Sequence, residues 1–112
     1  MPDTYTYLPD ILESIQDIPP DSIVSRTVYS DKQMKTILFA FAAEQELSEH
    51  TSSQTAVLYF VQGEANLTLG QDKMMAKAGT WVHMPPHLPH SILAKTPVIM
   101  LLSMFKPVVS ED

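Results

Sequence analysis

The fold is decided by residues 55–70, which read TAVLYFVQGEANLTLG. The first half of this stretch is rich in β-branched and aromatic residues, which favour strands. In the second half, from Glu64 to Leu69, polar and apolar side chains alternate, as in a strand with one solvated and one buried face. Gly63 and Gly70 follow the two halves and are typical of tight turns. We therefore expect an antiparallel meander.

Strand-like segments occupy most of the rest of the chain, between nine prolines and three glycines. Strands are expected over 23–29, 35–42, 55–61, 64–69, 73–78, 80–84, 91–94 and 98–105. Only residues 8–18 show helical spacing, and Pro19 and Pro20 end it, so a short helical or irregular segment is expected there. The predicted fold is all-β, with closed or sandwiched sheets.

Residues 36–42, TILFAFA, are apolar on both sides of their expected strand. Such a strand is covered on both faces. The second sheet would cover one face, and either the N-terminal segment or a partner would cover the other. We favour the partner, and expect a homodimer through this strand and residues 23–29.

Length and charge narrow the class of protein. The 112 residues suit one domain, with an N-terminal segment over 1–22 and a β-barrel over 23–106. The formal net charge of -6 makes nucleic acid and anionic membranes poor partners. No apolar stretch approaches the length of a membrane helix, and the first residues lack a secretory pattern, so we expect a cytoplasmic protein. The absence of cysteine excludes disulfides and thiolate ligands.

Histidines are the candidate chemical groups. His83, His87 and His90 lie within eight positions, and His50 is the fourth. Imidazole binds zinc, iron, copper and nickel well. Histidines in proline-rich loops are also often only solvated, and a lone buried histidine is often satisfied by a backbone carbonyl. Both interpretations stay open at this point.

Two segments resemble the two motifs of the cupin superfamily. They are EHTSSQTAVLYFVQG, residues 49–63, and GTWVHMPPHLPH, residues 79–90. The resemblance covers residues 39–105 and implies a small jelly-roll barrel. It also implies that two histidines and a glutamate from the first motif, with one histidine from the second, hold a divalent metal.

The ligand positions of the motifs match in part. His50 and His90 stand where the family has histidine, whereas Ser52 and Ala56 stand for the second histidine and the glutamate, so the first metal-binding motif is degenerate. The glycines of the motifs also match in part. Gly63 and Gly79 are kept, while Glu44 and His87 replace glycine. We expect His87 to lie solvated at the barrel mouth.

Two further side chains could complete a metal site. If residues 50–56 run without a bulge, Gln54 shares a face with His50 and offers an amide oxygen. His83 would reach the same hollow if its strand turns that face inward. The candidate metal ligands are therefore His50, His83, His90 and Gln54, and an empty pocket is the alternative.

The resemblance implies a cupin that binds a small molecule in its barrel. One form of this hypothesis adds a divalent transition metal (Fe, Mn, Zn, Ni or Cu) and dioxygenase- or isomerase-type chemistry, with catalytic residues not identified. The alternative is a metal-free, non-catalytic cupin that serves as a ligand sensor or a structural homodimer. Ser52 and Ala56 favour the alternative.

Overall fold

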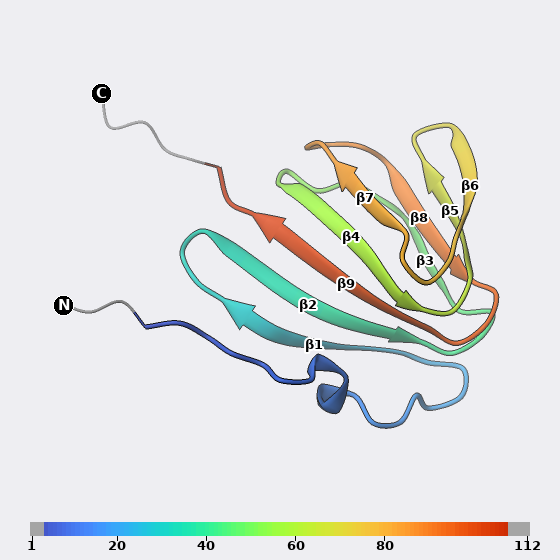
Figure 1. The fold of residues 1–112 in the computed structure, drawn as a ribbon. Helices are drawn as coiled ribbons and strands as arrows, with labels where there is room; N and C mark the ends of the chain where they lie inside the picture. The colour runs from blue at the N-terminus through green and yellow to red at the C-terminus, as the bar shows by residue number, and fades with distance from the viewer. Residues whose placement is uncertain (1–3, 108–112) are drawn as a thin grey trace.

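The protein is a sandwich of two antiparallel sheets, seen in a computed structural model that describes residues 4–107 (Figure 1). One sheet has the strand order β1-β2-β9-β4-β7 and the other β3-β8-β5-β6. The elements are η1 (Ile11–Ser14), β1 (Ile23–Ser30), β2 (Met34–Phe41), β3 (Glu46–His50), β4 (Thr55–Gln62), β5 (Ala65–Leu69), β6 (Asp72–Ala76), β7 (Trp81–Met84), β8 (His90–Ala94) and β9 (Val98–Phe105). The all-β prediction is confirmed.

All eight strands expected from the sequence are present, with ends that differ by two residues or fewer. The strand that was not predicted is β3, an edge strand whose residues are exposed apart from half-buried Leu47. Charged residues commonly protect such edges, and they hide the apolar alternation that identifies a strand. This omission matters because β3 carries His50.

The meander prediction is half right. β5 and β6 form the expected hairpin at Gly70, with Leu69 opposite Asp72. β4 does not pair with β5, because the chain at Gly63 crosses from the five-stranded sheet to the four-stranded one. Gly63 is therefore a crossover residue and not a hairpin turn, and the two halves of residues 55–70 supply opposite walls of the sandwich.

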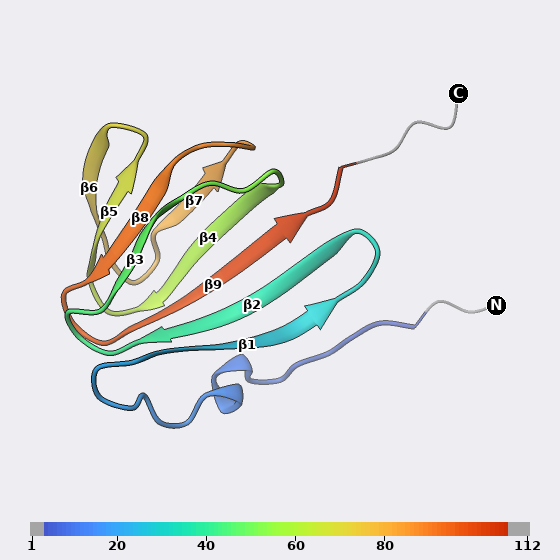
Figure 2. The same ribbon diagram turned by 180° about the vertical axis from the view of Figure 1, so that it is seen from behind.

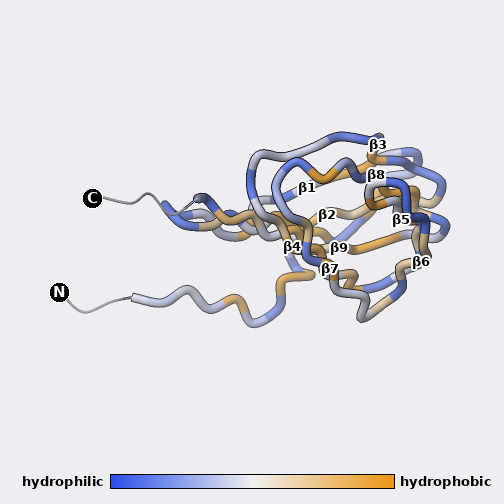
Figure 3. The backbone as a smooth tube through the Cα atoms, turned by 90° about the horizontal axis from the view of Figure 1, so that it is seen from above, coloured by the Kyte–Doolittle hydropathy of each residue, from blue (hydrophilic) through white to orange (hydrophobic). Residues whose placement is uncertain are grey.

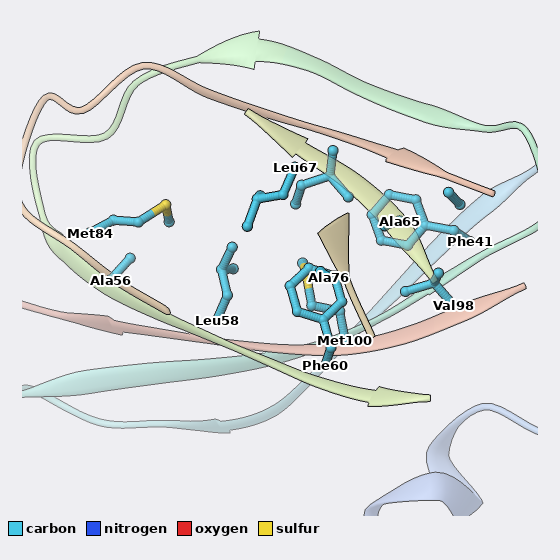
Figure 4. Close-up of a cluster of buried hydrophobic side chains, with 12 residues drawn as sticks. Phe41, Ala56, Leu58, Phe60, Ala65, Leu67, Ala76, Met84, Val98 and Met100 are labelled. Carbon is cyan, nitrogen blue, oxygen red and sulfur yellow. The ribbon is translucent and has the colours of Figure 1, made fainter. Parts of the chain in front are cut away.

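Apolar side chains from both sheets fill the space between them (Figure 4). Leu58 and Phe60 from β4 face Leu67 from β5, and all three are almost completely buried. The other buried members are Phe41, Ala56, Ala65, Ala76, Met84, Ile92, Ala94, Val98 and Met100. Burial of Phe60, Met100 and the other members of this cluster stabilises the packing of the two sheets.

A second apolar cluster covers the outer face of the five-stranded sheet. Leu38 from β2 is buried there beneath Ile11, Ile15 and Ile18 of the N-terminal segment, which runs beside β1 (Figures 1 and 2). The expectation that a partner covers this strand is therefore wrong for this region, because the chain's own N-terminal segment does so. That segment contains only a short 3-10 turn, η1, where Asp10 Oδ1 accepts a hydrogen bond from the Leu12 N–H at 3.0 Å.

Hydropathy follows this arrangement. The tube is hydrophobic along much of β2, β4 and β9, which lie next to one another in the five-stranded sheet (Figure 3). Among residues 4–107, none of the helical segments has the length and apolar character that crossing a membrane requires. Many of the hydrophobic side chains of these three strands pack in the two clusters.

Candidate functional site

The structure brings His50 and His90 together at one end of the four-stranded sheet. His50 ends β3 and His90 begins β8, and the two residues are directly opposite each other in the antiparallel pair. Their ring centroids are 4.1 Å apart, with 59° between the ring planes. Two positions along β8 from His90, Ile92 faces the core, so both rings lie on the core side of the sheet.

An irregularity in β3 is what places His50 on that side. Leu47 is opposite Ile92 and packs against the core, and His50 is opposite His90, so β3 advances three residues while β8 advances two. In a regular strand, residues three apart point to opposite faces. The extra residue in β3, a β-bulge, restores His50 to the same face as Leu47.

Each ring is fixed by a backbone carbonyl two residues before it. The Nδ1 atom of His50 lies 2.8 Å from the Ser48 oxygen, and Nδ1 of His90 lies 2.8 Å from the Leu88 oxygen. A carbonyl oxygen can only accept, so each Nδ1 carries a hydrogen, and in the neutral form of each ring Nε2 keeps its lone pair. Histidines that ligate metals usually have this arrangement, with the other ring nitrogen donating to a carbonyl or carboxylate.

The two rings differ in burial. His90 is 7% exposed, whereas His50 is exposed to solvent. Burial lowers the pKa of His90 below its usual value, and the neighbouring His50 lowers it further, although the hydrogen bond to Leu88 opposes both effects. His90 is therefore neutral at pH 7. The pair thus presents one buried neutral imidazole beside one that is open to solvent.

His83 does not join the pair. On β7, Val82 and Met84 pack against the core, and His83 between them is exposed on the outer face. The suggestion that His83 points into the hollow is therefore wrong. In a strand of only four residues, a shift by one residue exchanges the inner and outer faces. The sequence around Pro85 does not specify which of the two faces His83 takes.

Gln54 lies in the loop between β3 and β4 and not on the strand that carries His50. Residues 50–56 are not one extended strand, since β3 ends at His50 and β4 begins at Thr55. Gln54 lies half-buried in the intervening loop, and its backbone N–H donates to Ser52 Oγ at 3.1 Å. The prediction that Gln54 shares a face with His50 required one extended strand over residues 50–56, and the chain does not form such a strand.

His87 lies exposed in the loop before β8, as the sequence predicts. Its φ angle is 68°, in the left-handed region that favours glycine, and Glu44 has φ of 69°. At these two positions this chain has another residue where the cupin motifs have glycine. The His87 N–H donates to the Ser52 oxygen at 2.7 Å, which ties together the loops that precede β4 and β8.

We expect His87→Gly to raise the free energy of unfolding by about 0.5–1 kcal/mol, because glycine adopts this φ without the steric cost paid by histidine. Urea denaturation would measure the change. The matched control is His83→Gly, also exposed but within a strand, which should lower the stability. A destabilised His87→Gly protein would show that the imidazole makes a contact that outweighs the backbone strain.

The donor set near the pair is small. Among residues 4–107, there is no group of three or more histidine, aspartate or glutamate side chains placed to hold a metal ion. Ala56, at the position of the motif glutamate, is buried in the core, and Ser52 lies in the loop. The chemistry and orientation of His50 and His90 fit metal ligands, and ligand or solvent atoms would have to supply the remaining donors.

Comparison with known proteins defines the class. The family model described as the cupin domain matches residues 37–104, so this chain belongs to the cupin family. No curated relative matches the chain.

Solved structures agree with the fold. A cupin superfamily protein from Desulfitobacterium hafniense DCB-2 is similar with a TM-score of 0.81 at 22% identity, over 92% of this chain and 94% of that chain. A conserved protein of unknown function from Streptococcus pyogenes is similar with a TM-score of 0.81 at 25% identity, over 96% and 93%. An RmlC-like cupin from Shewanella frigidimarina NCIMB 400 has a TM-score of 0.76 at 16% identity, over 95% and 93%.

Proposed function

We propose that this protein is a small-molecule-binding cupin whose polar recognition site is the pair His50 and His90. The observation that carries the proposal is the pair of Nδ1 hydrogen bonds to backbone carbonyls, which leaves two Nε2 lone pairs at one place. His50 is exposed, so a ligand can reach it from solvent. His90 is buried, and its surroundings hold its Nε2 atom in a fixed orientation. Loop residues 51–54 and 85–89 lie beside this opening, joined by the His87 hydrogen bond.

We further propose that His50 and His90 would hold a divalent transition metal through their Nε2 atoms. Ser52 and Ala56 supply neither imidazole nor carboxylate, so the ion would keep several positions for water or ligand oxygen, and its affinity would be modest. A bound metal would act as a Lewis acid toward an oxygen atom of the ligand, the chemistry that dioxygenase- or isomerase-type reactions of the family require. In this protein, the two histidines hold the ion and position that ligand.

Metal titration tests the proposal. We expect the wild-type protein to bind one equivalent of Zn²⁺ in a calorimetric titration at pH 7.5, and His50→Gln and His90→Gln to bind it at least tenfold more weakly. Since a ligating imidazole must be neutral, the affinity should fall as the pH drops; because burial lowers the pKa of His90, this ring becomes protonated only below the usual range for histidine. The matched control is His83→Gln, which should bind like the wild type because His83 faces away.

Two results would contradict the metal site. Equal loss of affinity in His83→Gln would mean that zinc binds surface histidines without a defined site. No binding of zinc, iron, manganese, nickel or copper would favour the metal-free cupin, in which the two Nε2 atoms accept hydrogen bonds from the ligand itself.

We also propose that the protein is a homodimer, through the part of the outer sheet that the N-terminal segment leaves open. Tyr59 on β4 and Trp81 on β7 are directly opposite each other there, with 41% and 62% of their surfaces exposed. Leu101 on β9 is the next residue in the same row. Exposed aromatic side chains on an apolar face are typical of protein interfaces.

The dimer is tested by sedimentation at micromolar concentration. We expect particles of twice the 12.5 kDa chain mass for the wild type, and of one chain mass for Trp81→Ser. Met75→Ser, which removes another exposed apolar side chain from the opposite sheet, is the control and should stay dimeric. A wild type that sediments only as single chains would contradict the homodimer.

A further inference from the structure

A hollow of about 460 Å³ lies on the outer face of the four-stranded sheet, away from the histidine pair. All four strands of this sheet contribute to it. Asn66 and Thr68 on β5 point into it, because Ala65 and Leu67 beside them face the core. Volumes of this order are typical of small-molecule sites. Alternation in the sequence predicts these side chains as solvated, but it does not predict the curvature that makes a hollow.

The register places its side chains in two rows across the sheet. In one row, Leu93, Asn66 and Met75 are neighbours on β8, β5 and β6, and Glu46 extends the row on β3. In the other row, Ser91, Thr68 and Lys73 are neighbours on β8, β5 and β6. The floor therefore combines hydroxyl and amide groups with two apolar side chains.

The polar side chains of the hollow make no hydrogen bond or ion pair with another residue of the part of the chain that the structure describes. Across residues 4–107, the recorded hydrogen bonds of side chains do not include those of Asn66, Thr68 or Ser91, and the one ion pair joins Lys95 to Glu44. Several donors and acceptors thus converge on one space while remaining available to a ligand.

The two charges lie at opposite ends of the hollow. Glu46 is on the edge strand β3 and Lys73 is on the other edge strand β6. Four strands at the usual spacing of about 4.8 Å put these edges about 14 Å apart. An extended peptide of about four residues, at roughly 3.4 Å per residue, has the same length and carries an ammonium group at one end and a carboxylate at the other.

From this geometry we propose that the outer hollow binds a short linear peptide with free ends. Its carboxylate pairs with Lys73 and its ammonium group with Glu46. Its amide groups hydrogen-bond to Asn66, Thr68 and Ser91, while Leu93 and Met75 contact its side chains. The opposite charges at the two ends favour this zwitterion over a neutral sugar, which would leave both of them without partners.

The probe is tetra-alanine with free termini, and the measurement is titration of the full chain followed by NMR and calorimetry. We expect shifts of the amide signals of residues 66, 68 and 91. We also expect at least a tenfold rise in Kd when the peptide is acetylated and amidated, and a similar rise for Lys73→Met and for Glu46→Gln. Lys77→Met, which removes an exposed charge just beyond β6, is the matched control and should bind like the wild type.

Three results would overturn this inference. One is the absence of peptide binding to the wild type at millimolar concentration. A second is equal affinity for the free and blocked peptides. The third is binding of maltotriose that Thr68→Val weakens and Lys73→Met leaves unchanged, which would assign the hollow to a neutral polyhydroxylated ligand. Because the hollow and the histidine pair lie on opposite faces of the sheet, none of these results affects the metal titration.

Discussion

Gly63→Ala is expected to lower the free energy of unfolding by about 3 kcal/mol or more, because two costs add at this position. The φ angle of Gly63 is 92°, which side chains with a Cβ rarely adopt. A methyl group there would also overlap the carbonyl oxygen of Pro97 and lie 2.9 Å from Cα and Cγ2 of Val98.

The surroundings of Gly63 cannot move away easily. The Glu64 N–H donates to Thr96 Oγ1 at 2.9 Å, and the Lys95 N–H donates to the Glu64 oxygen at 2.8 Å. These bonds hold the crossover from β4 to β5 against the turn that precedes β9. Relief of the overlap would therefore require the turn or the crossover to shift.

Gly79→Ala is the matched control. Gly79 has φ of 96°, but a Cβ there would meet nothing within 4 Å. Its substitution should therefore cost only the backbone strain, about 1 kcal/mol. Urea denaturation of both variants measures the difference between them. Equal losses of stability would show that the backbone conformation of the glycine, and not the close approach of Pro97, determines the cost of the substitution.

Phe60→Ala is expected to cost about 3–5 kcal/mol, because it removes a fully buried ring from the centre of β4. Against a typical domain stability of about 5–15 kcal/mol, this leaves the variant partly unfolded at moderate temperature. Chemical denaturation followed by far-UV circular dichroism measures the loss. Phe60→Leu keeps most of the volume and should cost less than half as much.

Tyr7→Ala provides the control for loss of an aromatic ring. Tyr7 is 75% exposed, so its removal should change stability by less than about 0.5 kcal/mol. A small effect of Phe60→Ala would mean that the core repacks around the missing ring. Such a result would place the main contacts between the sheets elsewhere in the cluster around Leu58 and Leu67.

Much of the fold is predictable because the strands between the glycines and prolines alternate or are apolar throughout. β3 escapes this reasoning because only one of its residues, Leu47, packs in the core. The cover of β2 was assigned to a partner because periodicity shows that both faces are buried without showing what covers them. The isoleucines at 11, 15 and 18 are that cover, and their spacing was visible as an apolar stripe.

The candidate site was predictable only as far as the motif histidines. His50 and His90 meet as expected from the resemblance to cupins, and their ring hydrogen bonds require coordinates. His83 was expected on the inner face and lies on the outer one. Near a turn, the sequence does not show which residues of a short strand point inward. Gln54 was placed by assuming an unbroken strand where the chain forms a loop.

The bulge in β3 makes the histidine pair depend on spacing as well as on residue type. At the present spacing of three residues between Leu47 and His50, a β3 that paired without the bulge would turn the His50 ring to the outside. A homologue with one residue fewer in this segment would keep the pair by plain alternation, whereas one with the same spacing and no bulge would lose it. Alignments of this family should therefore count residues in this segment before assigning a shared site from two matching letters.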